Sequence, residues 1–267
     1  PERMSRSEKW SDLRTRLVSG AIVLVVGLWA VWCGGLSLRL LAVAVAGLAF
    51  WELTRLTDPE PSRRPVQIGV LAAGAMALVL YLHWPTWLLG LLLPSALGQI
   101  GPRKDRMIYA VYAFAILMAI YGFVAFREGY GLPFTLWLVG VVIASDVMGY
   151  FGGRLIGGPK FWPRLSPKKT WSGTIAGWVG AGLVGLIFVL LYRQPYGLIL
   201  FSALTAFAAQ MGDIAESAIK RRAGVKDSSN LIPGHGGLLD RFDALIGAAV
   251  FVLIWGLVQL PLPVFEG

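Results

Sequence analysis

Long apolar windows separated by short polar segments make up most of this chain. Each window holds roughly the 20 apolar residues that an α-helix needs to cross a bilayer. The fourth window has the weakest pattern, because it is short and contains Pro85 and Pro94. The pattern predicts an all-α polytopic membrane protein with about nine transmembrane helices, at about residues 17–35, 37–54, 67–83, 85–101, 107–126, 131–150, 171–192, 196–216 and 244–262.

The composition supports the same class. Of the 267 residues, 56% are apolar and 15% are charged, and the mean hydropathy is +0.66. Hardly any soluble domain has such a balance. The single cysteine, Cys33, lies in an apolar window. It excludes a disulfide framework, and we expect it to be a small buried side chain.

The distribution of positive charge predicts the orientation in the membrane. A net charge of +9 would suggest a nucleic-acid partner for a soluble protein. With nine spans, however, 21 of the 24 Lys and Arg residues fall on one side, and only Arg39, Arg127 and Arg193 fall on the other. Basic loops face the cytoplasm. We expect an integral protein of a bacterial inner membrane, with a cytoplasmic N-terminus, a periplasmic C-terminus and no nucleic-acid partner.

Polar residues are distributed unevenly between two parts of the chain. Few occur in the first five windows, which predicts an N-terminal scaffold of transmembrane helices over residues 1–126. Residues 127–267 contain most candidates for chemistry and are predicted to form a catalytic transmembrane region with cytoplasmic loops. Glu52 is the exception in the scaffold. Its carboxylate either pairs with Arg55 at the interface or reaches the site, and the sequence leaves both open.

Five acidic residues cluster near the predicted cytoplasmic surface. Asp146 ends the sixth window, Asp213 and Glu216 end the eighth, and Asp240 and Asp243 precede the ninth. The helical spacing places Asp213, Glu216, Ser217 and Lys220 on one face. A charged side chain inside the membrane costs about 2.5–3.5 kcal/mol on insertion scales. These acids therefore need either a bound cation or a salt bridge to a neighbouring helix.

Basic and hydroxyl side chains surround these acids. The segment SPKKTWSG supplies Ser166, Lys168, Lys169 and Thr170, and the loop before the ninth window contributes further bases and His235 in PGHGG. Oxygen ligands suit Mg²⁺, and with two histidines and one cysteine a zinc site is not expected. Carboxylates, Mg²⁺ and a ring of bases are typical of polyphosphate binding. A plainer alternative is that juxtamembrane bases only contact anionic lipid, and that Gly173, Gly177 and Gly180 serve close helix packing.

The second half of the chain resembles a known family. The loop and its flanks are similar to the full signature of the phosphatidate cytidylyltransferase, or CDP-diacylglycerol synthase, family. Asp146, Gly149, Tyr150, the GGR run and SPKKTWSG resemble further family blocks, whereas Ser172 departs from the Glu that family members commonly have. The residues that carry the signature are Ser217, Ile219, Lys220, Arg221, Lys226, Asp227, Ser229, Ile232, Pro233, His235, Gly236, Gly237, Leu238, Asp240, Arg241, Phe242 and Asp243.

The resemblance implies a reaction and a set of roles. CTP and phosphatidic acid would give CDP-diacylglycerol and pyrophosphate at a polar, cytoplasm-facing cavity, with Mg²⁺ as cofactor. The implied metal ligands are Asp213, Asp240, Asp243, Asp146 and Glu216. The implied catalytic residues are Asp213, Asp240, Asp243, Lys220, Arg221 and His235. The implied substrate-binding residues are Ser166, Lys168, Lys169, Thr170, Ser217, Lys226 and Arg241. A second, monovalent cation is left open, and the glycine-rich helix faces are compatible with a homodimer.

Two other functions fit parts of the pattern. A CTP-dependent kinase of a polyprenol or phytol would have a similar membrane core but would transfer the γ-phosphoryl group. A cation transporter would also place acids in its helices. Transport acids tend to lie near the bilayer midplane, whereas these cluster at one surface among bases. The complete signature favours cytidylyl transfer.

Overall fold

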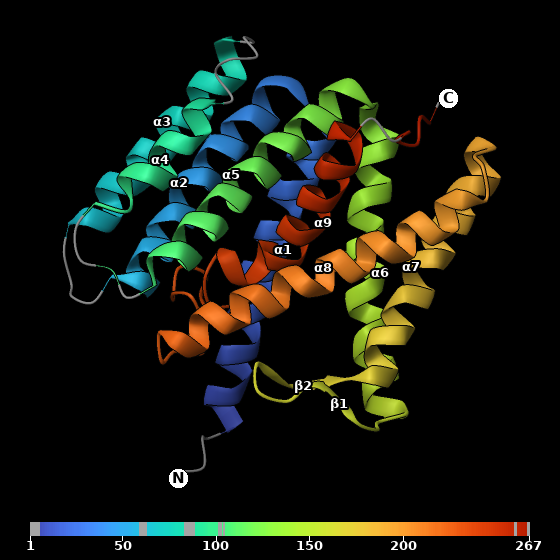
Figure 1. Cartoon of the computed structure of the whole chain (residues 1–267). Helices are drawn as coiled ribbons and strands as arrows, with labels where there is room; N and C mark the ends of the chain where they lie inside the picture. Colours follow the sequence, from blue (N-terminus) through green and yellow to red (C-terminus); the bar gives the residue numbers. More distant parts are fainter. Residues whose placement is uncertain are drawn as a thin grey trace.

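The computed structural model describes residues 6–58, 63–82, 89–100, 103, 105–258 and 261–265, with side chains from residue 18 onward. Within these residues the chain forms nine α-helices and one two-stranded sheet (Figure 1). The basic residues Arg3 and Lys104 lie outside the described residues. The elements are α1 (Arg6–Cys33), α2 (Gly35–Thr57), α3 (Arg64–Leu82), α4 (Leu92–Leu97), α5 (Arg106–Gly129), α6 (Gly131–Leu155), β1 (Lys160–Trp162), β2 (Ser166–Thr170), α7 (Trp171–Tyr192), α8 (Gly197–Arg222) and α9 (Leu239–Leu257).

The all-α membrane class is confirmed, but the number of nine spans is not. Six of the described helices, α2, α3, α5, α6, α7 and α8, are long and apolar enough to cross a membrane. The fourth predicted span, in its described part, contains only the six residues of α4. At 1.5 Å per residue such a helix is about 9 Å long and cannot cross a bilayer. Apolar composition alone does not determine where a helix ends.

Glycines bring α6, α7 and α8 into close contact. A Cβ atom on Gly173 would lie 2.6 Å from the Gly149 carbonyl oxygen, and one on Gly180 would lie 2.6 Å from Met148 Cγ. A Cβ atom on Gly177 would lie 2.6 Å from Gln210 Nε2 of α8. The prediction that these three glycines serve helix packing is confirmed. The three helices therefore lie at short separations near the acidic residues that they carry.

A second glycine contact joins α8 to α9 beside the acidic residues. A Cβ atom on Gly247 would overlap the Ala208 carbonyl oxygen and would lie 2.9 Å from the Gly212 Cα. Gly212 directly precedes Asp213, and Gly247 lies one helical turn after Asp243. This contact therefore determines how far apart the two carboxylates are held.

We expect Gly247→Ala to destabilise the protein by about 1–3 kcal/mol, because the added methyl group forces α8 and α9 apart. Thermal unfolding of the purified protein in detergent measures the effect. Gly74→Ala on α3 is the matched control, because a Cβ atom there meets nothing within 4 Å. Equal melting temperatures for the two variants would contradict the close contact.

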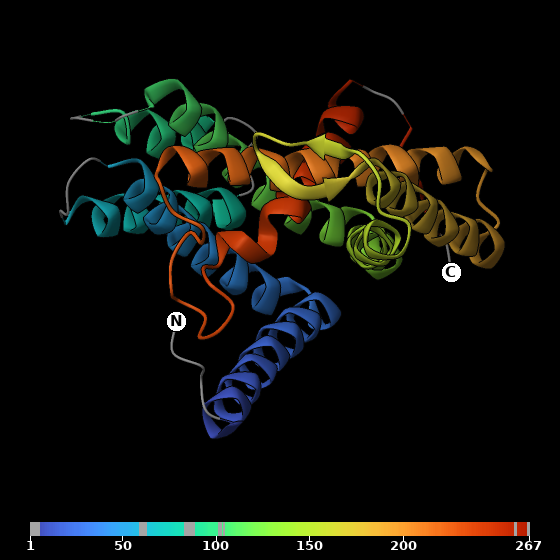
Figure 2. The same cartoon turned by 90° about the horizontal axis from the view of Figure 1, so that it is seen from below.

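A β-hairpin that the sequence pattern did not predict precedes α7. β1 and β2 pair antiparallel, with Lys160 opposite Thr170 and Trp162 opposite Ser166. Thr170 then caps α7, its hydroxyl oxygen accepting a hydrogen bond from the Gly173 amide at 3.2 Å. Seen from below, the hairpin lies across α8 (Figure 2). The hairpin thus carries Lys168 and Lys169 over the inner end of the helix bundle.

The first helix stands apart from the rest of the bundle (Figure 2). It is joined to α2 by Gly34 and Gly35, whose φ angles of 63° and 50° are readily adopted only by glycine. Cys33, at the end of α1, is exposed, so the expectation that it is buried was wrong. The reason is that α1 packs against the bundle along only one narrow face, and Cys33 lies on another.

Candidate functional site

A polar hollow of about 550 Å³ lies among β2 and the helices α6, α7, α8 and α9. Its volume is within the range of about 300–1,000 Å³ that is typical of small-molecule sites. It is the place where the predicted acids and bases meet. The lining residues are Ser145, Asp146, Gly149, Tyr150, Gly153, Arg154, Lys168, Lys169, Thr170, Gly173, Thr174, Gln210, Asp213, Asp240, Asp243 and Ala244.

Asp213 of α8 is paired across this pocket with Lys169 of β2. The Lys169 Nζ lies 2.5 Å from Asp213 Oδ2 and also donates to the Gln210 carbonyl oxygen at 3.4 Å. The Ser217 hydroxyl, one turn further along α8, donates to Asp213 Oδ1 at 3.4 Å. The Asp213 side chain is 31% exposed and that of Lys169 is 26% exposed. A ligand in the pocket can therefore reach both groups.

Lys220 of α8 pairs with one carboxylate of its own helix and with one carboxylate of α9. Its Nζ lies 2.6 Å from Glu216 Oε2 and 2.5 Å from Asp240 Oδ1. Glu216 is fully buried, and its other oxygen, Oε1, has no hydrogen-bond partner among the described residues. A buried charge is tolerated when it is paired. Of the two compensations that the sequence allowed for these acids, a salt bridge to a neighbouring helix is found for Asp240, whereas Glu216 pairs within its own helix and a bound cation stays a prediction.

Asp240 also holds the loop between α8 and α9. Its Oδ2 accepts hydrogen bonds from the Ser228 amide at 2.9 Å, the Ser228 hydroxyl at 3.0 Å and the Gly237 amide at 2.8 Å. Both oxygens of this carboxylate are thus engaged, one by Lys220 and one by the loop. The chain positions the start of α9 through the same side chain that lines the pocket.

Glu52 reaches this loop from the scaffold helix α2. It is fully buried and accepts hydrogen bonds from the Leu238 amide at 2.8 Å and the Leu239 amide at 2.7 Å. These amides lie at the start of α9, where backbone N–H groups lack partners within the helix. The Ser229 hydroxyl donates to it at 2.5 Å, and the Ser228 hydroxyl, whose one proton is shared with Asp240, lies 3.2 Å from it.

The sequence left open whether Glu52 pairs with Arg55 or reaches the site. Arg55 does not pair with it in the structure. Instead, the Arg55 guanidinium lies over the Trp51 ring, 4.7 Å from its centroid. Glu52 is therefore a buried anchor for the loop.

His235 lies at the tip of the loop and contacts α1. Its Nδ1 is 2.9 Å from the Ser19 hydroxyl oxygen, and that hydroxyl donates to the Pro233 carbonyl at 2.8 Å. The flanking Gly234 and Gly236 have φ angles of 75° and 82°. The His235 side chain is directed to α1 and does not line the polar pocket.

The remaining predicted residues are divided between the pocket and the loop. Asp146, Lys168, Thr170 and Asp243 line the pocket. Arg221, Arg241, Ser166 and Lys226 do not line the pocket. Arg221 donates to the Val225 carbonyl, and Arg241 donates to the His235 carbonyl. Their substrate-binding and catalytic roles stay predictions.

The sequence reasoning missed several uncharged polar groups of the pocket. Gln210 accepts from the Trp178 indole N–H at 3.0 Å, and its amide nitrogen donates to the Ser145 hydroxyl and the Thr174 carbonyl, each at 3.3 Å. A signal was present, because Gln210 is the polar residue one turn before Asp213 on an otherwise apolar stretch. Ser172 is the position that departs from the family pattern. Its hydroxyl donates to the Gly157 carbonyl at 2.5 Å and so binds the segment before β1 to the start of α7.

The donor chemistry of the pocket suits a divalent cation. Four aspartates line it and supply the oxygen ligands that Mg²⁺ prefers. Within the described residues, however, no three carboxylate, histidine or cysteine side chains are grouped closely enough to hold an ion. Asp213 is paired with Lys169, whereas Asp146 and Asp243 have no ion pair in the described part of the chain. The aspartates therefore fit a divalent cation by their oxygen ligands, but the described residues form no closed cluster around one.

The sequence of this chain is similar to a known protein family and to several named bacterial proteins. The model of the cytidylyltransferase family matches residues 14–258. A Brucella abortus protein (biovar 1, strain 9-941) named phosphatidate cytidylyltransferase is 32% identical over 92% of this chain and 94% of its own length. Proteins of the same name from Bacillus subtilis (strain 168) and Staphylococcus epidermidis (strain ATCC 35984) are 30% and 33% identical, over 90% and 88% of this chain and 96% and 95% of their own lengths. The chain therefore belongs to the cytidylyltransferase family.

Proposed function

We propose that this protein transfers the cytidylyl group of CTP to phosphatidic acid in a bacterial inner membrane, producing CDP-diacylglycerol and pyrophosphate. The observation that carries the proposal is the pocket itself, where four aspartates face Arg154, Lys168 and Lys169 at the ends of apolar helices. Anionic phosphates and a divalent cation are what such a mixed lining binds. The names of the relatives support the choice of substrates.

The reaction requires positioning and charge stabilisation more than proton transfer. An oxygen of the lipid phosphate attacks the α-phosphorus of CTP, a new P–O bond forms, and the bond to the pyrophosphate oxygen breaks. The lipid phosphate is already ionised near neutral pH, so no strong general base is needed. Lys168, Lys169 and Arg154 would hold the phosphate oxygens and stabilise the leaving pyrophosphate.

Asp213, Asp243 and Asp146 are the residues that we assign to Mg²⁺. When bound, the ion would supply positive charge that neutralises phosphate oxygens. Lys169 would change its ion-pair partner from Asp213 to a phosphate oxygen. Lys220 and Asp240 would keep α8, α9 and the loop in register throughout. Three further points stay predictions. They are metal ligation by Glu216 and Asp240, binding of a monovalent cation, and formation of a homodimer.

Product analysis tests this function directly. Purified protein is incubated with Mg²⁺, phosphatidic acid and CTP labelled separately at the α- and γ-phosphates. We expect the α label in the lipid and the γ label in pyrophosphate. A γ label in the lipid would instead identify a lipid kinase, and transfer of neither label to any lipid would contradict an enzymatic role.

A further inference from the structure

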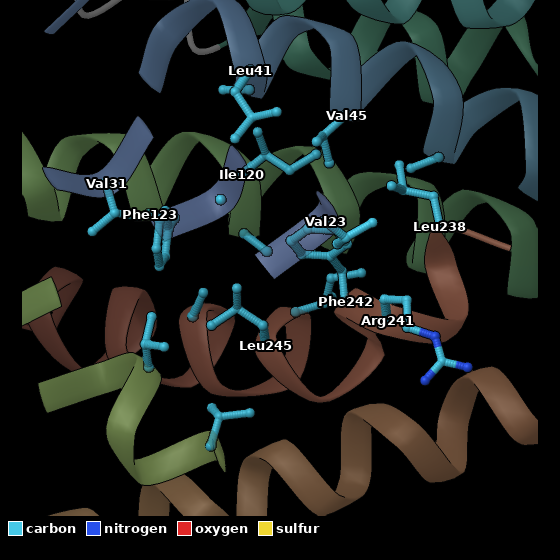
Figure 3. Close-up of a pocket in the computed structure, with 18 of the residues that line it drawn as sticks. Val23, Val31, Leu41, Val45, Ile120, Phe123, Leu238, Arg241, Phe242 and Leu245 are labelled. Atoms are coloured by element: carbon cyan, nitrogen blue, oxygen red, sulfur yellow. The ribbon is translucent and has the colours of Figure 1, made fainter. Parts of the chain in front are cut away.

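A second hollow, of about 280 Å³, lies between α1 and the helices α2, α5, α6 and α9. We call it the apolar groove. Figure 3 shows Val23, Ile120, Phe123 and Leu245 around it, contributed by α1, α5 and α9, with Arg241 at one side. In the part of the chain that the structure describes, Arg241 is the single charged residue of its lining. The groove is smaller than the roughly 300–1,000 Å³ of typical ligand pockets, so it has room for part of a chain-like molecule.

The apolar groove and the polar pocket are neighbours. On α6, Ile143 lines the groove and Asp146 lines the pocket, one helical turn apart on the same face. On α9, Phe242 and Leu245 line the groove whereas Asp243 lines the pocket. A molecule with an anionic head and an apolar tail would contact both hollows by lying along α6, because one face of that helix lines both.

We propose that the apolar groove holds an acyl chain of the phosphatidate whose phosphate occupies the polar pocket. This inference rests on the proposed function and adds the site of the lipid tail. Charge supports the choice of an anionic lipid, because the pocket lysines Lys168 and Lys169 lie on the head-group side and Arg241 lies beside the groove. A nucleotide does not suit the groove, because its lining offers almost no hydrogen-bonding groups.

The attachment of α1 explains how the groove stays open. At the C-terminal end of α1, the Arg127 guanidinium donates to the carbonyl oxygens of Val31 at 2.8 Å and Trp32 at 3.1 Å. Midway along α1, Ser19 is bound to Pro233 and His235 of the loop. Between these two attachments α1 spans the groove as one wall. Leu24 and Leu28 of that wall are also exposed, at 55% and 45%, so the groove is continuous with the lipid-facing surface of α1.

The groove contributes to positioning more than to affinity. An acyl chain gains little on leaving the bilayer, because lipid tails are as apolar as the groove lining. A chain held between α1, α5 and α9 fixes the depth and direction of its head group, and such orientation raises the rate of reaction. The consequence is a dependence of turnover on acyl-chain length that changes when the groove is filled.

Gly27→Leu places an apolar side chain in the groove. Gly27 lines the groove, and a Cβ atom there meets nothing within 4 Å. We expect kcat/KM for a long-chain phosphatidate, such as the dioleoyl lipid, to fall about tenfold, the usual loss for a misfit in an apolar pocket. For the dihexanoyl lipid, whose chains are too short to fill the groove, we expect a change within about twofold.

Gly74→Leu on α3 is the matched control. Gly74 is exposed, lies outside the groove, and a Cβ atom there also meets nothing within 4 Å. It should leave both substrates within about twofold of the original protein. If Gly27→Leu turned over long and short lipids with equal losses, or with none, the assignment of the groove would be overturned.

Photolabelling tests the groove independently of catalysis. Phosphatidic acid with a diazirine in the middle of one acyl chain is mixed with the full-length protein, irradiated and mapped by mass spectrometry. We expect labels on α1, α5 and α9 at groove residues, and fewer in Gly27→Leu. Labels confined to other surfaces would overturn the proposal. If product analysis failed but the groove was labelled, the proposed function would fall and the lipid site would stand.

Discussion

Asp213→Asn is expected to reduce cytidylyl transfer by roughly 10²–10³-fold, the loss that follows removal of one preorganised charge-stabilising group. The substitution keeps the shape of the side chain but removes its negative charge. Asp213 then no longer attracts the Lys169 ammonium that lies 2.5 Å away, and no longer offers a charged oxygen to a cation. Activity with saturating CTP and phosphatidic acid, measured across a range of Mg²⁺ concentrations, checks the prediction.

Asp105→Asn provides a control of the same chemistry. Asp105 forms an ion pair with Arg222 at 2.9 Å, and its side chain is 32% exposed, compared with 31% for Asp213. The pair lies outside the polar pocket. Because exposed ion pairs contribute about 0–1 kcal/mol, Asp105→Asn should leave turnover nearly unchanged. Near-normal activity in Asp213→Asn, with the melting temperature and membrane insertion also preserved, would show that Asp213 has no catalytic role.

The sequence predicted those features that depend on local spacing. The i, i+3, i+4, i+7 pattern placed Asp213, Glu216, Ser217 and Lys220 on one face of α8, and their mutual hydrogen bonds confirm it. The close packing at Gly173 and Gly177 followed from small residues at helical intervals. Helix type and face can be predicted in this way because they follow from a repeat of 3.6 residues.

The features that depend on distant partners could not be predicted. The apolar window at residues 85–101 reads like a span, yet its described part contains only the short α4. Nothing local in Glu52 indicates that its hydrogen-bond donors lie 176–187 residues further along the chain. Likewise, the attachment of His235 to Ser19 depends on where α1 lies. These three features depend on tertiary packing. The spacing of residues along one sequence does not show which distant residues will meet.

Glu52→Gln is expected to release the loop that Glu52 anchors. The carboxylate accepts hydrogen bonds from the Ser229 hydroxyl and from the Leu238 and Leu239 amides, and it shares the Ser228 hydroxyl with Asp240. A glutamine has one oxygen and one NH₂ group, so some of these buried donors must lose their acceptor. Each such loss costs about 1–3 kcal/mol. We expect a lower melting temperature, and faster hydrogen exchange at the amides of Leu238 and Leu239.

Turnover should fall in the same variant although Glu52 lies outside the polar pocket. The loop amides of Ser228 and Gly237 hold Asp240, and Asp240 holds Lys220, so a freed loop loosens the start of α9 beside Asp243. Glu128→Gln, which removes the charge of an exposed ion pair to Arg39, is the control and should cost about 0–1 kcal/mol. Unchanged exchange at Leu238 and Leu239 in Glu52→Gln would show that the loop keeps its position without this anchor. Faster exchange with full activity would show that an ordered loop is not needed for transfer.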